Sequence, residues 1–464
     1  MTTEIELKLR LQPEHLATLT SYLDQYARRQ DCQHLSNQYF DTAASDLAQQ
    51  RCALRVRKIS DGSYEQTLKT AGQLQDGIPH RREWNWPIDS DQFDPALLQD
   101  DDIRTELPDE LDIDDLTRVF RTDFERHIWW WEQPESQIEV VIDEGTIDAG
   151  DQQQSLCEVE LELKHGSASD LWQLAERLAE HCPLWLSDIS KAEQGYRLAQ
   201  LHRGWQPEEH IHPDSSTSEA LQQWLQQAVV GLQRSLELAL WHGDSQAGLE
   251  AWQYWHALKQ LPVLSSKVLK RRDSKVLREL LSPFEQPLAH LSALVTAGRF
   301  SGASDLYAAF RQQAARIRGD GRLAAALLAI VQQVQKLPLE HSQESALQRI
   351  QRIWRDEAEP ILQAAGNVSA EQWADRQVQY ARLRQLYLCR HSLQPEDVIE
   401  GAAAQQHRTR VRLLSDMLAG TTLLQVCRRP EAELGENSAT LRDEFAQYVP
   451  LELNSRLLQL RPQL

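Results

Sequence analysis

Cysteine is sparse in this chain, and its cysteines are spread far apart. The six cysteines stand at positions 32, 52, 157, 182, 389 and 427 of 464 residues, and no two of them form a Cys-x-x-Cys pair. Disulfide scaffolds are short and rich in cysteine, and sulfur-based metal motifs place cysteines a few residues apart. We therefore expect reduced thiols and a cytoplasmic protein.

Long apolar runs are also missing. The most apolar stretch, residues 323–334, holds about a dozen residues, whereas a membrane span needs roughly 20. The start, MTTEIELKLR, lacks the basic segment and apolar run of a secretory signal. A P-loop, GxxxxGK[ST], is absent as well. These absences predict a soluble protein that does not bind membranes and does not hydrolyse nucleotides with a P-loop.

Positive charge is scarce in the first part of the chain. Residues 1–200 hold 19 of the 49 Lys and Arg residues but 40 of the 69 Asp and Glu residues, and the net charge of the whole chain is −20. A nucleic-acid-binding protein needs a basic face. We therefore expect no nucleic-acid partner, and any anion bound by this part must meet a local basic cluster or bound cations.

The residue pattern changes near position 201. Before it, short segments of alternating polar and apolar residues predict strands, and helical spacing appears only at 13–29, 94–116 and 169–181, the last with Ser169 as N-cap. After position 218, apolar residues recur three and four apart. The intervening prolines and serines predict a linker.

The predicted fold class is α+β, with a strand-rich domain and an all-helical domain. Their bounds are 1–200 for the first domain, 201–218 for the linker and 219–464 for the second domain. The amphipathic stretches of the second domain are 220–241, 249–261, 275–297, 323–337, 343–365 and 370–388.

Charged residues gather on one face of several predicted strands. Because successive strand side chains point to opposite faces, Glu4, Glu6 and Lys8 share one face. One such strand is ordinary, since half-exposed strands alternate without any function. Here, however, a second carboxylate row at 158, 160 and 162 is joined by cationic residues at 55, 57, 69 and 81. Mg²⁺ takes carboxylate and phosphate oxygens, and Arg and Lys bind phosphate, so this mixture suits a polyanion carried on metal ions.

These residues resemble the CYTH domain, or triphosphate tunnel metalloenzyme, superfamily. The segment EIELK at 4–8 is similar to the ExExK signature of that family. Further elements follow in order, namely YFDT at 39–42, LRVR at 54–57, QTLK at 66–69, RRE at 81–83, FRTDFER at 120–126, VIDEG at 141–145, EVELEL at 158–163 and SKAEQGY at 190–196. The resemblance covers residues 1–200. It implies an eight-stranded antiparallel β-barrel that holds its substrate in a tunnel.

The resemblance also implies a set of site residues. Glu4, Glu6 and Lys8 are expected to be catalytic. The Mg²⁺ or Mn²⁺ ligands are expected among Glu4, Glu6, Asp143, Glu158, Glu160 and Glu162, with Glu160 and Glu162 preferred in the second row. The phosphate ligands are expected to be Lys8, Arg55, Arg57, Lys69, Arg81, Arg126 and Lys191. Arg82 remains an alternative to Arg81, and Arg121 could share the role of Arg126.

The function implied is metal-dependent hydrolysis of inorganic triphosphate to pyrophosphate and phosphate. The family also contains thiamine triphosphatases, adenylate cyclases and RNA triphosphatases, so these substrates stay open. A non-catalytic polyphosphate-binding scaffold is a further alternative, although four or more glutamates hinder plain anion binding. The helical part resembles the CHAD domain by its position and helicity. That likeness implies an accessory role, either binding a phosphate polymer or scaffolding.

Overall fold

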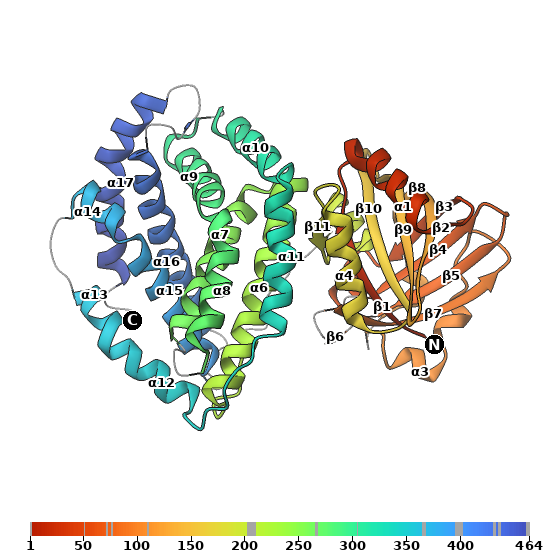
Figure 1. Cartoon of the computed structure of the whole chain (residues 1–464), viewed down its shortest axis with the longest axis horizontal. Helices are drawn as coiled ribbons and strands as arrows, with labels where there is room; N and C mark the ends of the chain where they lie inside the picture. Colours follow the sequence, from red (N-terminus) through yellow and green to blue (C-terminus); the bar gives the residue numbers. More distant parts are fainter. Residues whose placement is uncertain are drawn as a thin grey trace. The chain divides into compact units, whose positions relative to one another are not determined.

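The computed structural model divides into two compact units, Met1–Trp205 and Gln206–Leu464 (Figure 1). It describes every residue except 1, 51, 71–72, 76–77, 109–110, 202–209, 265–267, 304, 364–367, 395–401, 430–432, 435–437 and 461–464. The side chains of residues 2–4, 73–75, 78–81, 363 and 402 also lie outside the description. Residues 202–209 of the predicted linker therefore lie outside the described residues.

The first unit is built on one antiparallel sheet of eleven strands. The strand order is β11-β1-β10-β9-β8-β3-β4-β5-β7-β6, with β2 paired to β8, and β1 pairs with β7 as well as with β10. The strands are β1 (Thr2–Arg10), β2 (Arg28–Arg29), β3 (Gln33–Asp41), β4 (Ala53–Ile59), β5 (Tyr64–Lys69), β6 (Gln73–Gln75), β7 (Ile78–Ile88), β8 (Thr117–Gln133), β9 (Ser136–Ala149), β10 (Gln152–His165) and β11 (Trp185–Ser187).

Strand register brings the charged residues of different strands together. Lys8 pairs with Glu160, Glu158 pairs with Asp143, and Asp143 pairs with Arg126. Because strand side chains alternate in direction, paired residues and their neighbours two positions away share a face. We call this the charged face, and its described charged side chains include Glu6, Lys8, Arg10, Arg55, Arg57, Glu65, Lys69, Glu83, Arg126, Glu139, Asp143, Glu158, Glu160 and Glu162.

The opposite side of the sheet carries the apolar core. Leu7, Leu9 and Leu161 are fully or almost fully buried there, and helix α4 (Ala168–Ala179) contacts β1 and β10. The short helices expected between residues 94 and 116 cover the same side of β4 and β5, since their apolar residues pack in one cluster with Leu54 and Val56. The alternation of each strand thus separates an apolar side from a charged side.

Short helices complete the first unit. Helix α4 begins one residue after Ser167, whose N–H donates to the Asp170 carboxylate (2.8 Å), so the prediction of Ser169 as N-cap was wrong. Ser167 is the N-cap because Asp170, three positions later, accepts a hydrogen bond from its backbone N–H and completes a capping box. The remaining helices are η1 (Pro13–His15), α1 (Leu16–Tyr26), α2 (Asp46–Gln49), η2 (Pro95–Leu98), α3 (Asp101–Arg104), η3 (Ile113–Asp115) and α5 (Lys191–Leu198).

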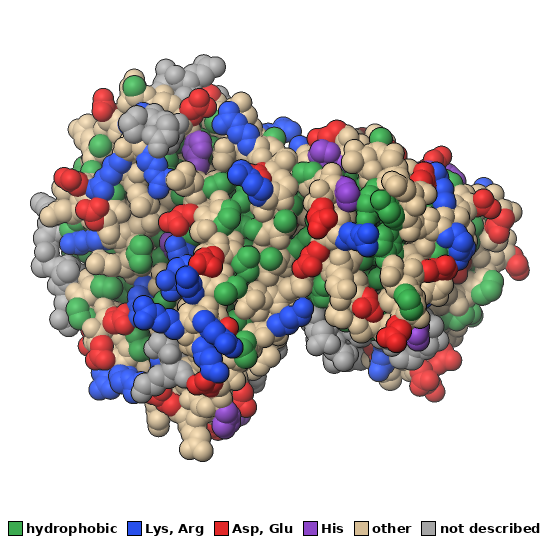
Figure 2. All heavy atoms as spheres, in the orientation of Figure 1, with side chains coloured by type: hydrophobic (Ala, Val, Ile, Leu, Met, Phe, Trp, Pro, Cys, Tyr) green, Lys and Arg blue, Asp and Glu red, His purple; other side chains and the backbone are tan. Residues whose placement is uncertain are grey.

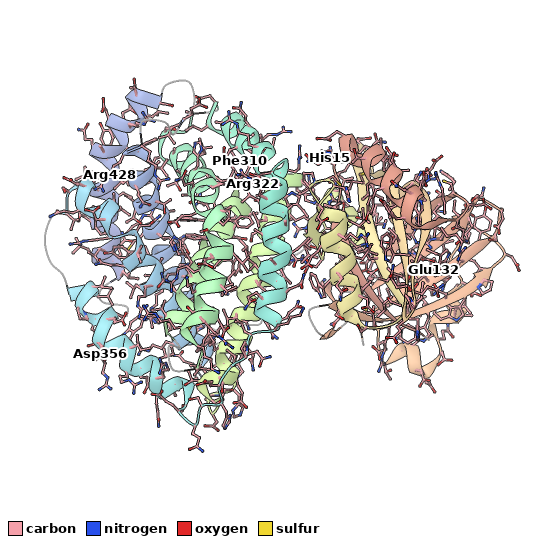
Figure 3. The ribbon with its side chains drawn as sticks, in the orientation of Figure 1. His15, Glu132, Phe310, Arg322, Asp356 and Arg428 are labelled. Carbon is pink, nitrogen blue, oxygen red and sulfur yellow. The ribbon has the colours of Figure 1, made fainter. Side chains whose placement is uncertain are left out.

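In the described residues of the second unit, the regular structure is helical apart from one isolated bridge between Ser216 and Ser345. Phe310, labelled in Figure 3, shows how closely the helices pack, because a Cβ on Gly248 would stand 2.8 Å from its ring. The helices are α6 (Thr217–Trp241), α7 (Ser245–Leu264), α8 (Arg271–Leu281), η4 (Ser282–Phe284), α9 (Glu285–Ser301), α10 (Asp305–Arg318), α11 (Gly321–Gln335), α12 (Ala346–Ile353), the π-helix η5 (Trp354–Ala358), α13 (Glu359–Gln363), α14 (Ala370–Asp375), α15 (Gln377–Ser392), α16 (Ala402–Cys427) and α17 (Ser438–Leu460).

Some helix boundaries differ from the predictions. The stretch 275–297 is two helices, because the short η4 turn with Pro283 separates α8 from α9. Proline cannot donate the backbone bond that a continuous helix needs at that point. Helix α6 begins at Thr217, where Ser216 and Glu219 cap each other through their side chains. Among the described residues, no helix has the length and apolar character needed to span a membrane.

Candidate active site

Three carboxylates converge at the centre of the charged face. One oxygen from each of Asp143, Glu158 and Glu160 lies within 4.8 Å of the others. Lys8 and Lys191 reach into this group, and Lys8 Nζ lies 3.1 Å from Glu158 and 2.5 Å from Glu160. Lys191 Nζ contacts all three carboxylates at distances between 2.5 and 2.8 Å. The group is thus a compact array of opposite charges shielded from solvent.

Arg126 extends this array along β8. Its guanidinium donates to both oxygens of Asp143 (2.8 and 2.7 Å) and to Glu160 (2.8 Å). Two parallel bonds to one carboxylate hold the arginine in a single orientation. Arg121, which is expected from sequence as a possible second contributor, faces away and donates to Ser36. Of the two arginines, Arg126 is therefore the one on the charged face.

Helix α5 brings Lys191 to the sheet. The helix starts at Lys191, and the Ser190 side chain caps it by accepting a bond from the Glu193 N–H (3.1 Å). Gly195 allows a close approach, because a Cβ there would stand 2.1 Å from the Phe120 ring of β8. The local sequence Ser-Lys-Ala-Glu-Gln-Gly thus places an ammonium group directly over the carboxylates.

A second, mainly cationic region continues the charged face over β4 and β5. Lys69 Nζ lies 2.7 Å from Glu83, and Arg55 lies 3.7 Å from the same carboxylate. Arg57 donates from Nε to Asn37 (2.8 Å). In the described part of the chain, Arg57 forms no ion pair with a carboxylate. Positive charge therefore exceeds negative charge here, as an anion-binding site requires.

The pKa shifts reflect this uneven charge. Burial would raise the pKa of Glu160, but Lys191, Lys8 and Arg126 hold it well below its usual value. Burial would lower the pKa of Lys8, but Glu158 and Glu160 raise it well above its usual value. Burial lowers the pKa of Arg57 to about 9, and the nearby charges of Arg55 and Arg126 add to this effect. A bound anion would relieve the repulsion among these three arginines.

The predicted site residues divide into three groups. The first group consists of residues that contact one another: Lys8, Arg126, Asp143, Glu158, Glu160 and Lys191. The second group lies beside it on the charged face and consists of Arg55, Arg57 and Lys69.

The third group lies outside these contacts. Glu162 pairs with Lys164 (2.6 Å), and its side chain is 22% exposed, while that of Glu158 is fully buried. Glu6 lies in register with Glu162. For Glu4 and Arg81 only the backbone pairing is described. Arg82 is exposed and pairs with Glu106.

Sequence reasoning left out three residues that the structure places in the site. Arg10 is almost fully buried and lies 3.5 Å from Glu158, and Glu83 joins Lys69 to Arg55. Alternation predicts the face of both, since Arg10 follows Lys8 by two positions and Glu83 follows Arg81 by two, but neither was expected to be a site residue. Asn37 gives no such signal, because its role depends on the pairing of β3 with β4.

Comparison with known proteins identifies the first unit. The family model of the CYTH domain matches residues 2–196. These residues form a CYTH domain. The resemblance noticed in the sequence is therefore confirmed for the part of the chain that carries the charged face.

A curated relative of the CYTH domain is the inorganic triphosphatase of Haemophilus influenzae. It is 36% identical over 201 residues, which make up 43% of this chain and 55% of that protein. The match thus spans about half of the relative's length.

Two solved structures are more distant. A putative adenylyl cyclase from Hippeastrum with a dominant triphosphatase activity has 22% identity and a TM-score of 0.32, covering 42% of this chain and 95% of its own. PptA from Streptomyces chartreusis has 13% identity and a TM-score of 0.34, covering 54% of this chain and 99% of its own. Similarity at this level supports no conclusion about activity.

Proposed function

We propose that the CYTH domain hydrolyses inorganic triphosphate in a metal-dependent reaction. One observation carries the proposal: a group of three converging carboxylates shares a single sheet face with the partly buried cations Arg55, Arg57 and Lys69. The carboxylates suit divalent cations, and the arginines and lysines suit phosphate oxygens. Tripolyphosphate bound through metal ions needs both kinds of group in one place.

We propose further that the charged face lines the inside of an eight-stranded barrel. The proposal rests on strand β1, which pairs with β10 along residues 6–10 and with β7 along residues 2–5. Pairing from β1 through β10, β9, β8, β3, β4, β5 and β7 would then return to β1. Charged residues buried inside such a barrel would meet the substrate in a space with little water, where their electrostatic effect is strong.

The carboxylate group fits a hard divalent cation. Its members are oxygen donors close enough to share one ion, and an ion would take the place on these oxygens that Lys8, Lys191 and Arg126 now occupy. Asp143, Glu158 and Glu160 would hold the ion. When bound, Mg²⁺ or Mn²⁺ supplies Lewis-acid polarisation of a phosphoryl oxygen.

The cations of the chain have their own part in the reaction. Arg55, Arg57 and Lys69 would bind the phosphate groups and orient them. Lys8 and Arg126 would turn from the carboxylates to the substrate and stabilise the charge spread over the transferred phosphoryl group. Such pre-oriented donors raise the rate because they need little rearrangement in the transition state.

The choice of inorganic triphosphate is supported by the name of the 36% identical relative, inorganic triphosphatase. The test is to offer the purified chain tripolyphosphate, thiamine triphosphate, ATP and long-chain polyphosphate with Mg²⁺ or Mn²⁺ and to measure phosphate release. We expect tripolyphosphate to give the highest kcat/KM and Glu160→Gln to abolish it. Tight binding of these anions without release would instead favour the non-catalytic scaffold.

We propose an accessory role in binding a phosphate polymer for the helical unit. Helix α8 supports this role, because Arg271, Arg272, Lys275 and Arg278 are exposed along it. Figure 2 shows several Lys and Arg side chains on the visible face of this unit. Some of this charge is already offset, since Lys275 lies 3.6 Å from Glu279. That the unit is CHAD-like stays a prediction.

A further inference from the structure

Strand β8 carries polar residues on the side opposite the charged face. Glu125 and His127 flank Arg126 in sequence, so their side chains point away from the carboxylate group. Cys32 precedes β3, whose first residue Gln33 pairs with Arg126. The register therefore places Cys32 beside His127.

We propose that Cys32, Glu125 and His127 form a binding site for a thiophilic divalent cation such as Zn²⁺. One ligand atom from each residue lies within 4.8 Å of the others. Cys32 Sγ and His127 Nε2 are each 4.0 Å from Glu125 Oε2. In a tetrahedral zinc site, bond lengths of about 2.0–2.3 Å put neighbouring ligand atoms about 3.3–3.7 Å apart. The two pairs at 4.0 Å would shorten by a few tenths of an ångström, and the Cys32–His127 pair, which lies within 4.8 Å, would shorten by up to about 1 Å through side-chain rotation.

The donor set decides the class of metal. Thiolate and imidazole favour Zn²⁺ and related transition metals, whereas Mg²⁺ prefers oxygen donors alone. Three protein ligands leave a fourth tetrahedral position for water. The site therefore differs in chemistry from the carboxylate group on the charged face, whose described members are Asp and Glu.

The histidine is available for coordination. Its Nδ1 atom is buried and, among the described residues, has no hydrogen-bond partner. Nε2 is the nitrogen that lies near Glu125, so Nε2 is the ligand atom of the proposed site. His34, which pairs with Glu125 in the sheet, is held by Asp123 (2.8 Å) and is not counted as a ligand.

The charges around the site permit a cation. Arg29 is the nearby positive group, and its guanidinium is bound to Asp24 (3.2 Å). Glu144 of β9 lies next to Glu125 in the register and adds negative charge. A thiolate and a carboxylate would together neutralise a divalent ion.

The experiment uses the full chain and Co²⁺ as a spectroscopic probe for Zn²⁺. Co²⁺ bound to a thiolate gives a sulfur-to-metal charge-transfer band in the near ultraviolet. We expect such a band, its loss when Zn²⁺ is added, and its absence in Cys32→Ser. Glu125→Gln and His127→Ala are expected to weaken Co²⁺ binding at least tenfold. Cys427→Ser, a control in the helical unit, is expected to keep the band.

Three results would overturn the site: no band in the wild-type chain, a band that survives in Cys32→Ser, or unchanged affinity in both Glu125→Gln and His127→Ala. If a variant misfolds, the alkylation rate of Cys32 is measured instead in the wild-type chain with and without Zn²⁺. We expect Zn²⁺ to protect the thiol, and alkylation at an unchanged rate would contradict the proposal. Failure of tripolyphosphate hydrolysis is a separate result, because the band does not depend on it. Glu160→Gln is therefore expected to keep the band.

Discussion

Three glutamates of β10 share a face but meet different surroundings. Glu158 and Glu160 are enclosed by Lys8, Lys191 and Arg126, whereas Glu162 lies two residues farther along and contacts Lys164. The pKa of Glu162 is raised, because its burial outweighs the effect of Lys164. Local charge therefore marks Glu158 and Glu160, rather than Glu162, as partners of Asp143.

This difference predicts unequal effects of the same substitution. Glu158→Gln is expected to lower kcat/KM for tripolyphosphate at least 100-fold, because it removes a carboxylate from the converging group. Glu162→Gln is expected to lower it less than tenfold. Steady-state phosphate release at several Mg²⁺ concentrations measures both. If Glu162→Gln lowered kcat/KM as much as Glu158→Gln does, the result would instead support Glu160 and Glu162, the metal ligands preferred from sequence.

At the scale of elements, helix α5 and strand β8 depend on one small residue. Gly195 lets α5 pack against Phe120, and Lys191 at the start of α5 gains its position over the carboxylates from that packing. A side chain at position 195 must push the helix from the sheet, since a Cβ would stand 2.1 Å from the ring. The stability of the first unit and the position of Lys191 therefore depend on the same packing contact.

Gly195→Ala is expected to destabilise the first unit by about 1–3 kcal/mol, as overpacking does. It is also expected to lower tripolyphosphate hydrolysis, because Lys191 moves with α5. Urea unfolding and phosphate release measure the two effects. Gly298→Ala in α9 is the matched control, since the nearest atom would be Leu306 Cβ at 3.9 Å. That control is expected to be neutral or to stabilise by up to about 1 kcal/mol.

At the scale of the whole molecule, charge burial makes the first unit sensitive to acid. Burial would raise the pKa values of Asp143, Glu158 and Glu160, but the surrounding cations lower all three. An unfolded chain has pKa values of about 3.9 for Asp and 4.3 for Glu, so it binds protons first when the pH falls. The ion pairs therefore contribute stability above that range and lose it below.

The first unit is expected to keep a constant free energy of unfolding down to about pH 5 and to lose stability steadily below about pH 4. Thermal unfolding followed from about pH 6 to about pH 3 checks this. In Glu160→Gln one of the three lowered pKa values is gone, so the slope of the loss is expected to be shallower. A free energy of unfolding that rises as the pH falls would contradict the lowered pKa values of Asp143, Glu158 and Glu160.

Much of the charged face could be predicted because strand alternation is a local property. The carboxylate row at 158–162 and the arginines at 55 and 57 are visible in the sequence, since their direction depends only on the backbone of their own strand. Helix ends were less accurate. Pro283 and the Ser167–Asp170 pair decide two of them, and both are short-range signals that helical spacing alone does not reveal.

The sequence by itself determined that residues 2–196 form a CYTH domain and that its strands have one charged side, because family motifs and alternation are read along the chain. Only the tertiary structure decided which charges meet. Glu158 joins Asp143 through the register of β10 with β9, and Lys191 joins them through the packing of α5. Cys32 and Glu125, separated by 93 positions, are neighbours because β3 pairs with β8. Hydrogen bonds between strands fix these distances, and no periodicity within one segment records them.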